Sequence, residues 1–205
     1  MLQTSAWRRR FLFVDANPVI VFLVLSDVII IGAQEMMGPV FAIFVIQQIQ
    51  GGNAAVVGVA AGVYAVVKSL AQVPLAFLVD KISGERDDYW AVVLGSLLMA
   101  MLPLTYLVID RPSQLYLIQG LLGLGAALAY PPYMAIFTRH IDRKQEGKEW
   151  GIRFTLVDLA AAAAAAIGGF IAFTLGFHTL IVIYVVIGLL GVTALFPIRR
   201  HLRQK

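Results

Sequence analysis

Ionisable residues lie inside three of the long apolar stretches of this 205-residue sequence. Asp27 and Glu35 lie in the first stretch, Lys68 in the second and Asp158 in the fifth, with Arg153 just inside the start of the fifth. An ionised side chain at the centre of a membrane helix costs about 2.5 to 3.5 kcal/mol on insertion scales, so such residues face a protein interior or water. Carboxyl groups near an ammonium can bind a polar solute or exchange protons, because burial and neighbouring charges tune their protonation.

The expected depths of these residues allow them to interact. At a rise of 1.5 Å per residue, Asp27 lies about 12 Å and Glu35 about 24 Å from the cytoplasmic end of the first helix. Lys68 lies about 18 Å from the same side, on a helix that runs in the opposite direction. An ion pair between Lys68 and either acid is therefore geometrically allowed. Asp158 reaches roughly the depth of Asp27.

Uncharged polar side chains extend this set at helical spacing. Gln34 follows Asp27 by seven residues, and Tyr64 and Gln72 flank Lys68 by four residues on either side. Polar contacts between membrane helices are common and individually weak, so these residues could serve only to hold helices together. Their number favours the alternative, which is a hydrated pathway or a binding cavity.

Prolines predict breaks at two places. Gly38 and Pro39 interrupt the first stretch, and Pro131 and Pro132 follow Tyr130 in the fourth. Proline removes a backbone donor and kinks a helix, so a cavity or a hinge could lie at either place. A fixed kink that neighbouring groups satisfy is the other interpretation. Tyr130 joins the candidate substrate or coupling residues on this ground.

The composition indicates a membrane protein. Hydrophobic residues make up 60% of the chain and charged residues 14%, whereas a soluble domain is about 25% charged. A bilayer crossing needs roughly 20 apolar residues. Six stretches qualify, over 18–46, 54–79, 90–109, 113–138, 150–175 and 178–198. We therefore predict an all-α membrane protein with six transmembrane helices within 18–198, a cytoplasmic N-terminal segment over 1–17 and a cytoplasmic tail over 199–205.

The positions of Lys and Arg predict the orientation. Thirteen of the 16 lie in the N-terminal segment, the second and fourth connections and the tail, which alternate with connections that are almost free of them. Cytoplasmic loops retain cationic residues, so both termini are expected in the cytoplasm, with the protein multi-pass in the cell membrane. The net charge of +4 follows from this orientation, so it does not indicate a nucleic-acid partner. The expected surrounding partner is membrane lipid.

Motifs of common enzyme and metal sites are absent from the sequence. It contains no Cys, no HExxH, no pair of His at metal-ligand spacing, and no P-loop or dinucleotide fingerprint. The three His residues lie at predicted helix ends or in the tail. We expect no enzyme activity, no metal and no cofactor.

The connection after the second predicted helix resembles a known transporter motif. The segment AFLVDKISGERDD at 76–88 is similar to motif A of the major facilitator superfamily. Leu78, Asp80 and Lys81 match this motif directly, and Gly84 and Arg86 match it one place late. The resemblance implies a cytoplasmic gate formed by Asp80, Lys81, Arg86 and Arg139, in which Asp80 pairs with Arg139 or another cation.

The resemblance extends over nearly the whole chain but only to one half of a typical member. It implies a bundle of three plus three helices and secondary-active transport of a small solute by alternating access, as a symporter or uniporter with protons as a candidate coupling ion. Half of such a transporter needs a second half, and a parallel homodimer is the expected partner arrangement. The alternative is a non-transporting subunit that assembles with a different membrane protein.

Overall fold

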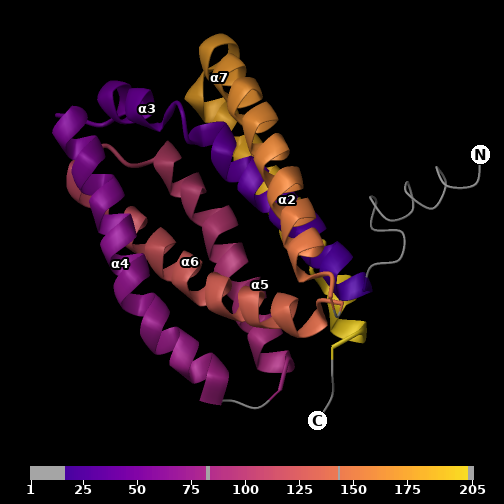
Figure 1. Cartoon of the computed structure of the whole chain (residues 1–205). Helices are drawn as coiled ribbons and strands as arrows, with labels where there is room; N and C mark the ends of the chain where they lie inside the picture. The colour runs from indigo at the N-terminus through magenta and orange to yellow at the C-terminus, as the bar shows by residue number, and fades with distance from the viewer. Residues whose placement is uncertain (1–16, 82–83, 143, 203–205) are drawn as a thin grey trace, which may run out of the picture.

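The computed structural model describes residues 17–81, 84–142 and 144–202 and contains helices but no strand within them. The elements are α2 (Pro18–Met37), α3 (Phe41–Gln48), α4 (Ala54–Lys81), α5 (Arg86–Met101), η1 (Leu102–Leu107), α6 (Pro112–His140), α7 (Glu146–Thr193) and η2 (Phe196–Arg200). Figure 1 shows them as one bundle. The prediction of an all-α protein is confirmed for the described residues.

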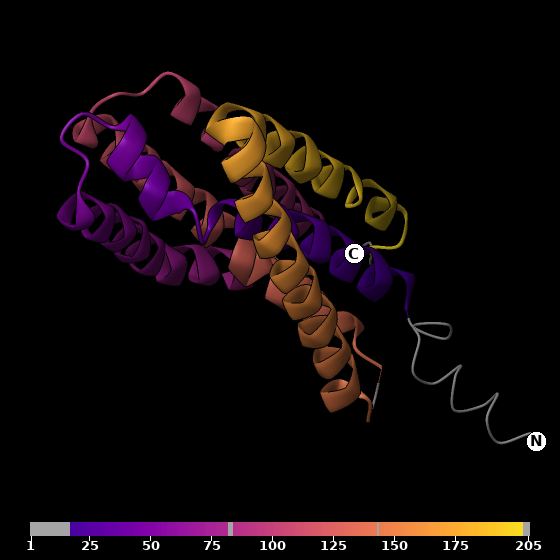
Figure 2. The same ribbon diagram turned by 90° about the horizontal axis from the view of Figure 1, so that it is seen from above.

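Five helices in this part of the chain are long and apolar enough to cross a membrane. The longest, α7, is not one rod, because Gly176 has φ +81° and ψ 168°, a conformation that glycine adopts without steric cost. The chain reverses there, so α7 forms two antiparallel arms (Figures 1 and 2). Gly176 lies at the break predicted between the fifth and sixth apolar stretches.

The predicted proline breaks have different outcomes. Gly38 and Pro39 separate α2 from the short helix α3, so the first apolar stretch is two helices. Pro131 and Pro132 instead lie inside α6, which stays helical from Pro112 to His140. The third stretch ends in a single 3-10 segment, η1, which follows α5 directly.

The bundle is built from two main helix pairings joined by α5. Helix α2 packs along α7, α4 packs against α6, and α5 contacts both α6 and α7. Small residues permit the close approaches, since a Cβ on Gly168 of α7 would overlap the backbone of Met36 in α2. An apolar cluster that includes Leu23, Phe137 and Ile198 joins α2, α6 and η2.

Helix α4 is the least buried of the long helices, with 11% of its most apolar 18-residue window buried. It lies at one side of the bundle (Figure 1). Large apolar side chains such as Leu70 and Phe77 are exposed on it. In a membrane these surfaces contact lipid or another protein.

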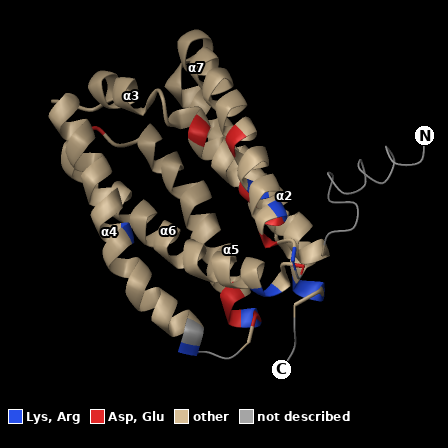
Figure 3. Ribbon diagram, in the orientation of Figure 1, with Lys and Arg blue, Asp and Glu red and all other residues tan. Residues whose placement is uncertain are grey.

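Charged residues gather at one end of the bundle, near the ends of α4 and α6 and the start of α5 (Figure 3). This end is the one that the sequence predicts to be cytoplasmic. Asp110 and Arg111 lie in the connection between η1 and α6, and they form an exposed ion pair of 3.8 Å. A few further charges lie along the bundle, between its ends, on α2, α4 and α7.

Candidate functional site

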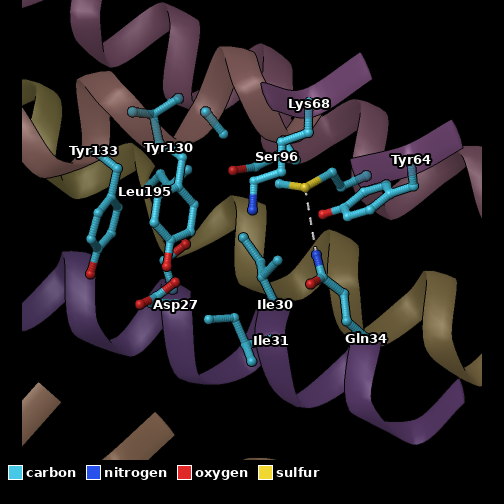
Figure 4. A pocket seen from close by; sticks show the side chains of 15 residues that line it. Asp27, Ile30, Ile31, Gln34, Tyr64, Lys68, Ser96, Tyr130, Tyr133 and Leu195 are labelled. Atoms are coloured by element: carbon cyan, nitrogen blue, oxygen red, sulfur yellow. Dashed lines mark hydrogen bonds between the residues drawn. The ribbon is translucent and has the colours of Figure 1, made fainter. Parts of the chain in front are cut away.

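A cavity of about 200 Å³ lies between α2, α4, α5 and α6. Its polar lining consists of Ser26, Asp27, Gln34, Tyr64, Lys68, Ser96, Tyr130 and Tyr133. Apolar side chains such as Ile30, Ile31 and Leu195 form much of the rest (Figure 4). Five of the predicted site residues, Asp27, Gln34, Tyr64, Lys68 and Tyr130, therefore line one cavity.

Helical spacing explains why these residues converge. Asp27 and Gln34 are seven residues apart on α2, so both face the same side of that helix. Tyr64 and Lys68 are one turn apart on α4, and Tyr130 lies one turn before Tyr133 on α6. The three helices present these faces to the same space.

Asp27 forms a buried ion pair with Arg153 of α7. Arg153 Nη2 lies 2.5 Å from Asp27 Oδ2, and the side chains are 2% and 12% exposed. Arg153 Nε also donates a hydrogen bond of 3.3 Å to the hydroxyl of Tyr133. The guanidinium lies over the rings of Tyr133, Trp150 and Phe154, at 5.0 to 5.8 Å from their centroids. The carboxylate of Asp27 in the cavity is therefore neutralised by the guanidinium of Arg153 from a neighbouring helix.

Lys68 has different surroundings. Its Nζ lies 5.1 Å from the ring centroid of Tyr130 and 5.9 Å from that of Tyr64. Among the residues that the structure describes, no carboxylate forms an ion pair with Lys68. The pairing of Lys68 with Asp27 or Glu35, which the expected depths allow, is not present. The cation that neutralises Asp27 is Arg153 instead.

A second cavity of about 260 Å³ adjoins the first. Both cavities are lined by Gln34, Tyr64 and Met99, and Gln34 Nε2 donates to Met99 Sδ over 3.6 Å. The second cavity extends to Pro103 and Tyr106 of η1, away from the charged end of the bundle. The contact between Gln34 and Met99 thus lies between two adjoining spaces.

Three predicted site residues do not line either cavity. Glu35 is half-buried on α2, where Oε2 faces Gly38, and Gln72 is half-buried on α4. Asp158 is exposed on the first arm of α7. These residues remain candidates only for a site that includes a further protein surface.

The sequence did not single out Ser26, Ser96 and Tyr133, which also line the cavity, or Arg153 as the partner of Asp27. Tyr133 carries a signal, because it follows Tyr130 by three residues and so shares its helix face. Arg153 lies near the start of an apolar stretch, at the level of the membrane surface, where a cation is expected even without a buried partner. The serines carry no signal of their own.

The predicted gate residues lie at the charged end of the bundle. Arg139, at the end of α6, pairs with the buried Asp88 of α5 at 2.5 Å. Lys81 and Arg86 are exposed at the end of α4 and the start of α5. The side chain of Asp80 lies outside the described side chains, so its predicted pairing with Arg139 is untested.

A second contact joins the same two helices. His140 Nε2 lies 3.6 Å from Glu85 Oε2, and both side chains are buried. His140 Nδ1 is 3.0 Å from the carbonyl oxygen of Ile136, one turn earlier in α6. The start of α5 and the end of α6 are therefore joined by two adjacent polar contacts. The described residues contain no group of three or more His, Asp or Glu placed to hold a metal ion.

Comparisons with known proteins identify relatives of this fold. A family model described as Major Facilitator Superfamily matches residues 23–205. A structure of a mutant of the peptide transporter POT in complex with alafosfalin has a TM-score of 0.73 and 16% identity, and the match covers 88% of this chain. A structure of the same mutant in complex with sulfate matches equally well, with a TM-score of 0.73 and 16% identity over 88% of this chain. Comparison with curated proteins gives no match.

The coverage of the other chain is much lower. The match spans 38% of the alafosfalin-bound transporter and 37% of the sulfate-bound one. The chain therefore corresponds to less than half the length of these transporters. At this identity the likeness establishes the helical arrangement, and the cavity must be interpreted from its own residues.

Proposed function

This chain belongs to the Major Facilitator Superfamily, and we propose from that premise that it is a secondary-active membrane transporter of a small solute. The observation that carries the proposal is the cavity between α2, α4, α5 and α6. Asp27, Gln34 and Lys68 line it within helices that are otherwise strongly apolar. Polar side chains inside membrane helices mark substrate and ion pathways, because their burial is costly without such a role.

We propose that the transporting unit is a parallel homodimer. A single bundle leaves Asp158 exposed on α7, about 18 Å along the first arm, where lipid would contact an ionised group. It also leaves α4 exposed along most of its length. A second bundle that covers the first arm of α7 would remove the cost at Asp158, and the exposed apolar face of α4 offers it a surface to pack against. Two copies with the same orientation are related by an axis along the membrane normal, as the halves of the family are.

The proposed topology has six crossings, with each arm of α7 counted as one. Both termini are then cytoplasmic, with 1–17 as the N-terminal segment, 18–198 as the membrane domain and 199–205 as the tail. Support comes from the charged residues that gather at one end of the bundle, since cytoplasmic ends retain Lys and Arg (Figure 3).

Alternating access would proceed by rocking of the two bundles around a central space between them, with the described cavity of each bundle as the binding site. Asp27 is the proposed proton-coupling residue, because protonation of its carboxylate would remove the charge that holds Arg153. Asp80, Lys81, Arg86 and Arg139 are the proposed cytoplasmic gate. Glu35, Gln72 and Asp158 are proposed to contribute once the second bundle is present.

Uptake into liposomes tests the transport function. Full-length protein reconstituted in liposomes is incubated with a mixture of small solutes, and the lumen is analysed by mass spectrometry. We expect at least one solute to enter faster than into protein-free liposomes, and the Asp27→Asn variant to lose its accumulation under a pH gradient. Entry of no solute, or a purified monomer bound only to a different membrane subunit, would contradict the proposal.

A further inference from the structure

The charges in and beside the cavity sum to one positive charge, because Asp27 and Lys68 line it and Arg153 lies against Asp27. Asp27 and Arg153 neutralise each other through their 2.5 Å ion pair. Lys68 then contributes one positive charge, and no described carboxylate forms an ion pair with it. A single unbalanced charge in an apolar bundle is unfavourable unless an opposite charge binds beside it.

The contacts of Lys68 position the ammonium without neutralising it. The rings of Tyr130 and Tyr64 lie 5.1 and 5.9 Å from Nζ, and an aromatic ring attracts a cation through its quadrupole and carries no net charge. Figure 4 shows Lys68 pointing into the cavity towards Ile30, with Tyr130 to one side and Gln34 to the other. The ammonium is therefore directed at the space that a ligand would occupy.

The groups around Lys68 are those that an anion needs. Gln34 can donate from its amide, and its present acceptor is Met99 Sδ at 3.6 Å, which is a weak acceptor. The hydroxyls of Tyr64 and Tyr130 line the same cavity. An incoming oxygen could replace the sulfur as the acceptor of Gln34, at little cost to the protein.

We infer that the cavity binds a small organic anion with one carboxylate group, and that Lys68 is its counter-ion. The inference rests on the proposed transport function and specifies its substrate class. One carboxylate balances the one unpaired ammonium, whereas a phosphate group carries more charge and is usually met by several donors or by the fork of an Arg. Arg153 is not available as such a fork, because it is bound to Asp27 and Tyr133.

The cavity also disfavours amines and zwitterions. A substrate ammonium would need an acid of its own, and the acid that lines the cavity is already paired with Arg153. The apolar part of the ligand would contact Ile30, Ile31 and Leu195. A volume of about 200 Å³ fits a compact molecule, and a longer one would extend past Gln34 and Met99 into the second cavity.

Binding to the purified full-length chain tests the inference. The probes are straight-chain acids from acetate to hexanoate and phenylacetate, each compared with its amide and with the amine of the same carbon skeleton. The readouts are the shift in melting temperature and the Kd by calorimetry. We expect at least one carboxylate to stabilise the protein, and its amide and amine to have no effect.

Variants of Lys68 assign the effect to this residue. Lys68→Met should weaken carboxylate binding about tenfold or more, since it removes a charged partner of the ligand. Lys68→Arg keeps the charge and should retain part of the affinity. Lys148→Met is the matched control, because Lys148 is exposed at the start of α7 and contacts Gln145. The melting temperature of each variant without ligand reports whether it is folded.

Three results would overturn the inference: no carboxylate binds, an amide or amine binds as tightly as its carboxylate, or folded Lys68→Met keeps the wild-type affinity. The liposome assay separates this failure from failure of the transport proposal. Carboxylate binding without uptake of any solute would refute the transport proposal but would still support a cavity that binds carboxylates. Uptake of a neutral or cationic solute without carboxylate binding would refute the proposed carboxylate ligand but would still support the transport proposal.

Discussion

Arg153 of α7 and Asp27 of α2 form a buried ion pair beside the cavity, with Nη2 and Oδ2 2.5 Å apart. The pair joins two helices that pack along each other, and Tyr133 of α6 adds a third helix through its hydrogen bond to Arg153. One arginine therefore holds the acid that lines the cavity and connects three helices. Protonation of Asp27 would therefore weaken contacts among all three helices.

Removal of Arg153 is expected to destabilise the protein strongly. In an Arg153→Met variant the carboxylate of Asp27 loses its counter-ion in a buried position, and an uncompensated buried charge costs about 3 to 5 kcal/mol. The melting temperature of the detergent-purified protein should fall accordingly. The double variant Asp27→Asn with Arg153→Gln, which removes both charges, should recover part of the loss. A double variant less stable than Arg153→Met would contradict the proposed role of the pair.

Glycines at helix crossings are expected to be intolerant of a methyl group. A Cβ on Gly95 of α5 would lie 2.5 Å from the carbonyl oxygen of Gly125 in α6 and 2.7 Å from the backbone nitrogen of Ala129. Gly95→Ala should therefore force α5 and α6 apart and cost about 1 to 3 kcal/mol of stability. Thermal melting measures the loss.

Gly32→Ala in α2 is the matched control for that substitution, because Gly32 lies outside the proposed dimer interface. Apart from the adjoining backbone of its own helix, no atom lies within 4 Å of the place of a Cβ on Gly32, and alanine favours a helix by about 1 kcal/mol over glycine. This variant should be as stable as the parent or more so. Equal losses in the two variants would show that helix packing is not the cause.

Some features of the site were predictable from the sequence for direct physical reasons. Apolar length determines which segments can span a bilayer, and so the break at Gly176 was expected from the short segment 176–178. Helical periodicity places Asp27 with Gln34, and Tyr64 with Lys68, on common faces. The convergence of these faces on one cavity followed from the cost of exposing them to lipid.

The pairing of charges was not predictable in the same way. Rise per residue determines depth, but it does not determine which helices are neighbours or how each is rotated. Asp27 meets Arg153 because α2 packs along α7, whereas α4 packs against α6 and keeps Lys68 away from Asp27. Asp158 follows Arg153 by five residues, which is about 140° around the helix, so Arg153 points inward and Asp158 outward.

The exposed face of α4 offers a test of the proposed homodimer. Apart from the adjoining backbone of its own helix, no atom lies within 4 Å of the place of a Cβ on Gly62, so a larger side chain there points into open space within one bundle. If α4 packs against a second copy, Gly62→Leu should prevent the close approach and shift the protein to monomers. Light scattering of the purified protein, corrected for detergent, measures the mass.

Val186→Phe is the control for this experiment. Val186 is 52% exposed on the second arm of α7, which the proposed dimer leaves in contact with lipid. This variant should keep the mass of the parent. A Gly62→Leu protein that remains a dimer would place the interface elsewhere and contradict the proposed arrangement.

The ion pair between Arg139 and Asp88 is expected to stabilise the contact between α5 and α6 at the charged end of the bundle. The Asp88 side chain is 2% exposed, so Arg139→Gln would leave a buried carboxylate without this partner 2.5 Å away. We expect a loss of about 1 to 3 kcal/mol and faster proteolysis at the adjoining connections, because a buried acceptor that loses a charged donor is costly. Asp88→Asn with Arg139→Gln should be less harmful than Arg139→Gln alone, since an amide costs less to bury than a carboxylate.

Arg200→Gln is the control, because Arg200 lies at an exposed position of η2 and its loss should leave both stability and proteolysis unchanged. Equal proteolysis rates in Arg139→Gln and Arg200→Gln would remove Arg139 from the proposed gate.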